Sequence, residues 1–152
     1  MKIIFLDIDG VLNSRKYDIQ RGADGGNIDV SRLELLRELI FRTGAKVVIA
    51  STWREHWDPT GVFTDRDGMI LEATFKSYDI ELFDKTPTLN DRASEIRAWL
   101  EKNQDVESFV IIDDNGLGWG EMAEYLVKTD YYIGRGLEEH HIEEAAEILM
   151  KQ

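Results

Sequence analysis

Three runs of apolar residues, each followed at once by polar residues, constrain the fold of this chain more than any other feature. They cover residues 3–6, 47–50 and 109–112. A continuous apolar run that ends in a turn predicts a strand buried on both faces, as in a parallel sheet. Because parallel strands share one direction, the polar residues after the three runs should meet at one edge of the sheet. That edge is where ligands bind in open α/β sheets.

Segments with helical spacing of apolar residues separate the runs. The first is expected at residues 31–42, with Ser31 as its N-cap and Gly44 just past its end. Two more helices are expected, from Asn90 or Asp91 to about Lys102 and over residues 137–150. This alternation predicts a single α/β domain over residues 1–152, three-layered and Rossmann-like, with a mostly parallel sheet between helices.

The remaining segments predict loops, turns and short strands. Residues 14–27 are interpreted as a flexible loop near the end of the first strand, and residues 65–68 as a turn. Further short strands are expected at residues 69–71, 80–83 and 126–128.

Composition narrows the class of protein. The chain has 152 residues, 43% hydrophobic and 32% charged, as in a globular protein with its own core. It has no cysteine, so we expect no disulfide and no thiolate chemistry, in keeping with a cytoplasmic location. Neither a signal peptide nor a membrane span is expected, because the first apolar run ends already at Asp7.

The net charge of −12 affects which partners the chain can bind. It disfavours binding to a polyanion such as nucleic acid, although the basic residues Arg15, Lys16 and Arg21 keep that partner open. An acidic protein that handles anions needs a divalent cation or a few well-placed Lys and Arg side chains at its site. The sequence does not indicate the oligomeric state.

The polar residues after the three strands form the candidate site. Asp7 and Asp9 point to the same side of an extended segment, where their charges repel unless a cation or a shared proton compensates. Asp113 and Asp114 follow the third strand, and the four carboxylates together suit Mg²⁺. Candidate ligands for an anionic oxygen are the hydroxyl groups after the second strand and one basic residue near the next helix: Ser51, Thr52, and Lys85 or Arg92.

These residues resemble the motifs of the haloacid-dehalogenase-like (HAD) phosphohydrolases, in the order of that superfamily. Residues 6–11 match its Asp-x-Asp-Gly motif, residues 47–51 its strand that ends in Ser or Thr, and residues 111–114 its strand that ends in an acidic pair. Arg92, rather than Lys85, is the preferred match for the basic third motif. The runs at 50–54, 92–100 and 136–137 are similar to small, capless members, including the HAD domain of RNA-repair proteins. The stretches after the first two motifs are too short for a folded cap domain.

The resemblance implies a mechanism. Asp7 would attack phosphorus and form an aspartyl-phosphate, and Asp9 would act as general acid and then base. Mg²⁺ would be held by Asp7, by Asp9 through its backbone carbonyl, and by one of Asp113 and Asp114. The substrate is a phosphomonoester of unknown size, and a polynucleotide end or a nucleotide stays open. The alternatives are a non-catalytic module that binds phosphate and metal, and then a phosphotransferase or dehalogenase.

Other polar and aromatic residues receive a structural interpretation. His140 and His141 are expected on a solvated helix face, and His56 has no partner at a useful spacing. Asp130 is interpreted as a turn residue. For Trp53, Arg54 and Trp57, contact with a leaving group and simple packing are both open.

Overall fold

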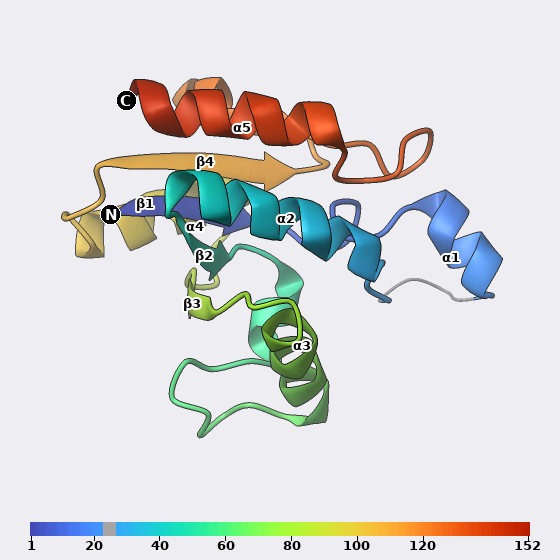
Figure 1. Ribbon diagram of the computed structural model, residues 1–152. Helices are drawn as coiled ribbons and strands as arrows, with labels where there is room; N and C mark the ends of the chain where they lie inside the picture. Colours follow the sequence, from blue (N-terminus) through green and yellow to red (C-terminus); the bar gives the residue numbers. More distant parts are fainter. Residues whose placement is uncertain (23–26) are drawn as a thin grey trace.

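The computed structural model describes residues 1–22 and 27–152, which contain a five-stranded sheet with the order β3-β2-β1-β4-β5. All neighbouring strands are parallel, and β1 lies at the centre (Figure 1). The strands are β1 (Lys2–Leu6), β2 (Lys46–Ile49), β3 (Leu82–Lys85), β4 (Ser108–Asp113) and β5 (Leu126–Lys128). The three strands predicted from the apolar runs are therefore β1, β2 and β4.

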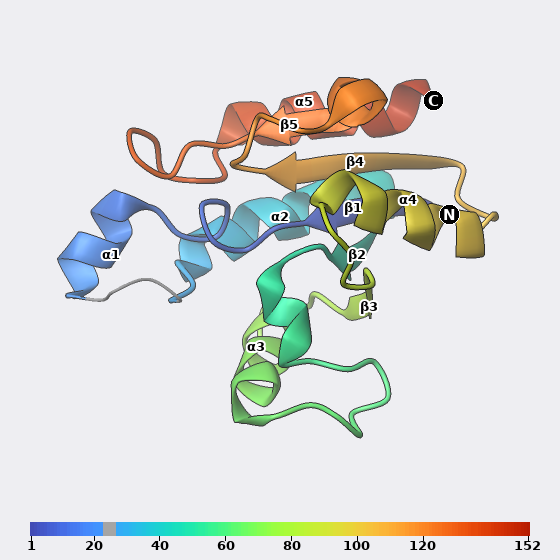
Figure 2. The same ribbon diagram turned by 180° about the vertical axis from the view of Figure 1, so that it is seen from behind.

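Helices cover both faces of the sheet, as the views from front and back show (Figures 1 and 2). The helices are α1 (Arg15–Arg21), α2 (Val30–Thr43), α3 (Arg66–Lys76), α4 (Arg92–Lys102) and α5 (Glu139–Lys151), with 3-10 helices η1 (Thr52–Glu55) and η2 (Gly120–Tyr125). Side chains of α2 and α5 pack on one face of the sheet, and those of α4 and η2 on the other. The three-layer α/β/α fold predicted from the sequence is confirmed.

Alternating side chains of the strands feed two separate cores. Ile4 and Leu6 of β1 join the core under α2 and α5, whereas Ile3 and Phe5 join the core under α4. The Phe5 ring meets the edge of Trp99 with ring centroids 5.4 Å apart, so Trp99 is a core residue as its helical spacing suggests. Truncation of a fully buried aromatic ring such as Phe5 to Ala costs about 3–5 kcal/mol.

Several local predictions were wrong, because side-chain caps start helices where the sequence indicates loops. Ser14 caps α1 through the backbone N–H of Tyr17, so that the predicted loop contains a helix up to Gly22. The rest of that loop, residues 23–26, lies outside the described residues. Asp29, not Ser31, is the N-cap of α2, whereas Gly44 ends that helix as predicted.

The region between β2 and β3 differs most from the prediction. The expected turn at 65–68 is the start of α3, because Asp65 accepts the backbone N–H of Gly68 and caps the helix. The apolar residues expected to form a strand are split by the helix: Met69 and Ile70 are exposed and Leu71 is buried. The strand expected at 80–83 begins only at Leu82.

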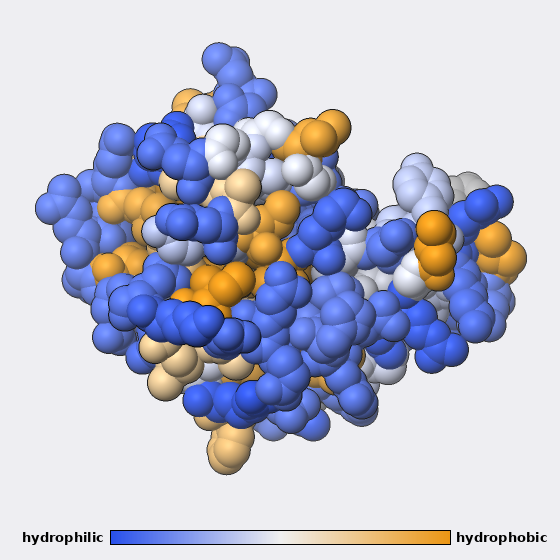
Figure 3. Space-filling view, turned by 90° about the horizontal axis from the view of Figure 1, so that it is seen from above, coloured by the Kyte–Doolittle hydropathy of each residue, from blue (hydrophilic) through white to orange (hydrophobic). Residues whose placement is uncertain are grey.

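The surface of the molecule is mainly hydrophilic, as the high proportion of charged residues suggests. Figure 3 shows the side on which α5 lies, where hydrophilic residues dominate and hydrophobic ones form small separate patches. Within the described residues, the segment between β1 and β2 holds α1 and α2, and the segment between β2 and β3 holds η1 and α3. No helix within residues 1–22 and 27–152 has the length and apolar character needed to cross a membrane.

Candidate active site

Three carboxylates meet where β1 and β4 end. The registers Leu6–Ile49 and Leu6–Ile112 align the ends of the three central strands. As a result, Asp7, Asp113 and Asp114 bring one oxygen each to within 4.8 Å of one another. Asp7 and Asp113 are 9% and 3% exposed. The prediction that these strand ends meet at one sheet edge is confirmed.

Gly10 makes room for this cluster. Its φ of 85° lies in the left-handed region, and a Cβ atom at this position would lie 2.1 Å from Asp114 Oδ2. Its N–H donates to Asn13 Oδ1 at 2.8 Å, and its carbonyl accepts the Thr129 hydroxyl at 2.7 Å. The turn after β1 is therefore fixed from two sides, with the Asp114 carboxylate packed against its glycine.

Arg92 is the cation closest to the cluster in the described part of the chain. One guanidinium nitrogen lies 3.0 Å from Asp113 Oδ2 and 3.5 Å from Asp7 Oδ1, and it also donates to the Ala50 carbonyl. Arg92 Nε lies 3.4 Å from Glu95, which pairs with the buried Arg54 at 2.7 Å. This chain of charges holds the Arg92 side chain in place.

Lys85, the other candidate for the basic position, lies elsewhere. Its ammonium group donates to the backbone carbonyls of Arg54 at 3.0 Å and Trp57 at 2.7 Å. It thus supports the segment around η1 and does not contact the carboxylates of the cluster. Of the two basic residues, Arg92 alone is brought together with Asp7 and Asp113.

The crowding of carboxylates changes their ionisation. Burial, and then the charge of Asp113, raise the pKa of Asp7 to about 8, against the opposing effect of Arg92. Burial also raises the pKa of Asp113, although the N–H of Asn115 opposes this. One arginine therefore does not balance the negative charge gathered here, and the cluster suits an additional cation.

The side chain of Asp9 lies outside the cluster of three carboxylates. It is exposed, and each of its oxygens accepts one hydrogen bond: Asn13 Nδ2 donates to Oδ1 at 2.9 Å, and Trp53 Nε1 donates to Oδ2 at 3.2 Å. The prediction that four carboxylates come together is therefore wrong for the side chain of Asp9, because the cluster contains only Asp7, Asp113 and Asp114 among the described residues. Asp7 and Asp9 therefore have different surroundings, one buried among charges and one held at the surface.

The hydroxyl residues after β2 also differ from each other. Ser51 is 1% exposed and caps η1, where its oxygen accepts the Trp53 N–H at 3.2 Å. Thr52 is exposed and lines a separate cavity.

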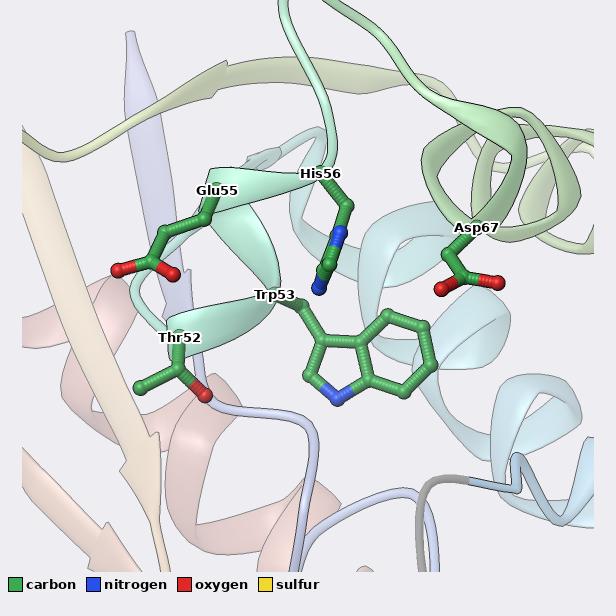
Figure 4. Close-up of a pocket in the computed structure, with 5 residues that line it drawn as sticks. All are labelled: Thr52, Trp53, Glu55, His56 and Asp67. Atoms are coloured by element: carbon green, nitrogen blue, oxygen red, sulfur yellow. The ribbon is translucent and has the colours of Figure 1, made fainter.

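Two cavities lie at the ends of the central strands and beside η1. One of about 490 Å³ contains the carboxylates and Arg92; it is lined by Asp7, Arg54, Leu89, Asn90, Asp91, Arg92, Glu95, Asp113, Asp114 and Asn115. The other, of about 440 Å³, is lined by Thr52, Trp53, Glu55, His56 and Asp67 (Figure 4). Trp53 lines the second cavity and donates to Asp9, which is a lining residue of neither cavity.

A comparison with protein families agrees with this site. The family described as the HAD domain in Swiss Army Knife RNA repair proteins matches residues 3–142. The chain belongs to this family. As a HAD domain it is a phosphohydrolase of the HAD type in general, and the predicted relationship is confirmed. Neither the comparison with curated proteins nor that with solved structures found a match.

The sequence did not indicate several residues that shape this HAD domain's site. Glu95 lies on the buried side of α4, but nothing in the spacing separates it from the exposed glutamates of other helices. Arg54, for which packing and substrate contact were both open, is buried as its partner. Asn13, which donates to Asp9, follows the first motif closely in the sequence, and this closeness is the only sign of the contact that the sequence offers.

The histidine predictions were wrong in two places. His56 does have a partner, since its Nδ1 lies 2.7 Å from Asp65 Oδ2, and the hydrogen bond raises the pKa of His56. His141 is buried, and its Nδ1 accepts the Glu138 N–H at the start of α5. Asp130 is a turn residue as predicted, accepting the N–H groups of Tyr132 and Ile133.

Proposed function

We propose that this HAD domain hydrolyses a phosphomonoester with the help of Mg²⁺, through an aspartyl-phosphate on Asp7. The observation that carries the proposal is the combination of a buried carboxylate, Asp7, beside Arg92, with an exposed carboxylate, Asp9, two residues away. Nucleophilic attack and proton transfer need carboxylates in different surroundings. A module that only bound phosphate and metal would have no use for the second one.

The residues present fit Mg²⁺. Carboxylate oxygens are the ligands this ion prefers, and Asp7, Asp113 and Asp114 supply three within 4.8 Å of one another. Burial raises the pKa of Asp7 and of Asp113, and the charge of Asp113 raises that of Asp7 further, so a divalent cation bound there would favour the ionised carboxylates. Bound there, the ion would neutralise phosphoryl charge and screen Asp7 from its neighbours.

The reaction proceeds in two displacements at phosphorus. In the first, an Asp7 oxygen forms a bond to phosphorus while the bond to the leaving oxygen breaks, and Asp9 gives its proton to that oxygen. In the second, water attacks phosphorus, Asp9 takes the water proton, and the bond to Asp7 breaks. Asp7 returns as a carboxylate, Asp9 is protonated again, and inorganic phosphate leaves.

Arg92 and Ser51 bind the transferring phosphoryl group. Arg92 already faces Asp7, so an oxygen on the attacked phosphorus comes within reach of its guanidinium. The Ser51 oxygen accepts a backbone N–H, which leaves the hydroxyl proton to donate to a phosphoryl oxygen. Phosphoryl transfer depends mainly on such positioning and charge.

The family's name refers to RNA repair, which makes a phosphate at a nucleic-acid end one candidate substrate. The net charge of −12 weighs against a polyanion, whereas the exposed basic residues of α1, Arg15, Lys16 and Arg21, favour one. A panel that includes aryl phosphates, nucleotides and end-phosphorylated oligonucleotides covers these possibilities.

Metal-dependent hydrolysis of an aryl phosphate tests the proposal. We expect turnover with Mg²⁺ and none after chelation, and Asp7→Asn should abolish it. Asp9→Asn should lower kcat about 10²–10⁴-fold and leave Mg²⁺ affinity nearly unchanged. Asp105→Asn, which changes an exposed carboxylate before the start of β4 and so at the end of the sheet opposite the site, is the control and should behave as wild type. Absence of metal-dependent turnover on the whole panel would instead support a binding module.

A further inference from the structure

The cavity between η1 and α3 has no part in the steps proposed above. It is lined by Thr52, Trp53, Glu55, His56 and Asp67, and its volume is about 440 Å³. In Figure 4 the indole of Trp53 forms its floor, His56 lies above that ring, and Asp67 faces it from α3. We call these five residues the η1 cavity.

The η1 cavity lies next to the group that transfers the proton. Trp53 Nε1 donates to Asp9 Oδ2 at 3.2 Å, and Figure 4 shows the indole nitrogen turned towards the loop that follows β1. In the proposed reaction the leaving oxygen receives its proton from Asp9. The group attached to that oxygen therefore lies on the Asp9 side, where Trp53 is the adjoining surface.

The chemistry of the η1 cavity suits one class of leaving group. Trp53 and His56 form an aromatic wall, with ring centroids 6.2 Å apart and planes at 70°. Glu55 and Asp67 add carboxylates that accept hydrogen bonds, and no Lys or Arg is among the lining residues. Aromatic faces and carboxylates favour a flat ring, a hydrogen-bond donor or a cation, and repel an anion.

Two further observations concern His56 and its neighbours: whether they bind a metal, and what charge they give the cavity. His56, Asp65 and Asp67 could in principle hold a metal, but Asp65 already caps α3 and bonds to His56. When His56 is protonated, its single positive charge faces three carboxylates, those of Asp65, Asp67 and Glu55, so the cavity keeps a net negative charge.

We propose that the η1 cavity binds the leaving group of the substrate, selecting flat groups that carry hydrogen-bond donors or positive charge and rejecting anionic ones. The inference rests on the proposed phosphatase activity. It names a substrate class: monophosphate esters of aromatic alcohols or phenols with an amino group, rather than esters whose leaving group carries further phosphates or carboxylates.

A matched pair of phosphate esters tests this selection. O-phosphotyramine and the phosphate ester of 3-(4-hydroxyphenyl)propionate have the same alkylphenol leaving group and differ in the charge at the end of the tail. We expect kcat/KM to favour the cationic ester by about tenfold at low salt. The preference should disappear in Glu55→Gln/Asp67→Asn. The control Glu81→Gln/Glu101→Gln removes two exposed carboxylates before β3 and at the end of α4, and should keep it.

The outcomes separate this inference from the proposed function. Equal kcat/KM for the two esters, or a preference that survives Glu55→Gln/Asp67→Asn, would overturn the inference while the phosphatase activity stands. If neither ester is hydrolysed, the proposed function fails. Binding of the free phenols then tests whether the η1 cavity is a binding site. Tyramine should then shift the Trp53 indole N–H signal in NMR spectra, and 3-(4-hydroxyphenyl)propionate should not. No shift with tyramine would reject the cavity as a binding site.

Discussion

Arg92 and Asp113 form an ion pair of 3.0 Å that joins the start of α4 to the end of β4. The same guanidinium reaches Asp7 on β1 and the Ala50 carbonyl after β2. One side chain therefore ties together the ends of the three central strands, where the candidate active site lies. Lys85, although closer in sequence to β2, supports the neighbouring backbone instead.

The first prediction separates these two basic residues. Arg92→Ala removes the cation beside Asp7 and should lower kcat/KM for an aryl phosphate about 10²–10³-fold. Lys85→Met leaves the site intact but deprives two backbone carbonyls of their donor, so it should lower the free energy of unfolding by about 1–3 kcal/mol. Turnover per folded molecule should not change in Lys85→Met. The assignment is wrong if Lys85→Met, rather than Arg92→Ala, abolishes turnover.

A second prediction concerns the buried pair of Arg54 and Glu95. Their side chains are 6% and 4% exposed, so removal of one partner leaves a charge buried without compensation. Glu95→Ala should lower the free energy of unfolding in urea by about 3–5 kcal/mol. Glu101→Ala, on the exposed side of the same helix, should change it by no more than about 0.5 kcal/mol. Similar values for the two variants would show that the pair contributes little.

Gly10 and Gly44 provide a matched pair of substitutions. Both have positive φ, 85° and 71°, but only at Gly10 would an added Cβ meet other atoms, those of Asp114. Gly44→Ala should therefore cost about 1 kcal/mol of stability and leave Mg²⁺ affinity unchanged. Gly10→Ala should also weaken Mg²⁺ binding, measured by calorimetry, because Asp114 must move. Equal Mg²⁺ affinity in the two variants would argue against a role for Asp114 at the site.

The fourth prediction follows from the raised pKa of Asp7. The Asp7 carboxyl group keeps its proton up to about pH 8 in the folded chain, but only up to about pH 3.8 in the unfolded chain. Between these pH values the folded state therefore binds more protons than the unfolded state. The free energy of unfolding of the metal-free protein should therefore fall as pH rises through this range. Asp7→Asn should remove most of that slope, and above about pH 8 it should melt at least about 2 °C higher than wild type.

Two controls accompany that measurement. Asp105→Asn, at an exposed position, should keep the wild-type dependence of melting temperature on pH. Added Mg²⁺ should raise the melting temperature of wild type more than that of Asp7→Asn. Parallel pH profiles for wild type and Asp7→Asn would contradict the raised pKa.

The sequence predicted the sheet and the strand-end residues well, because buried parallel strands are continuous apolar runs. Asp7, Asp113 and Asp114 meet as expected, since strand direction alone brings them to one edge. It failed at α1 and α3, where Ser14 and Asp65 start helices whose apolar residues are few or half exposed. Periodicity is weak there, and the deciding interactions are single side-chain caps.

The contacts between side chains of distant segments could not be predicted. Glu95 is paired with Arg54 across 41 positions of the chain, and Trp53 reaches Asp9 across 44. Neither contact leaves a pattern in one sequence, because each depends on how η1 is packed against α4 and the loop after β1. The η1 cavity therefore appears only in the folded chain.

Chemical trapping of the intermediate tests the central claim most directly. Acyl phosphates are reduced by borohydride, and an aspartyl-phosphate yields homoserine in place of aspartate. We predict that wild type, treated with borohydride during Mg²⁺-dependent turnover, contains homoserine at position 7 in its peptide map. Protein treated without substrate should keep Asp7. Turnover with no homoserine at position 7, or homoserine at Asp9, Asp113 or Asp114 instead, would contradict the account.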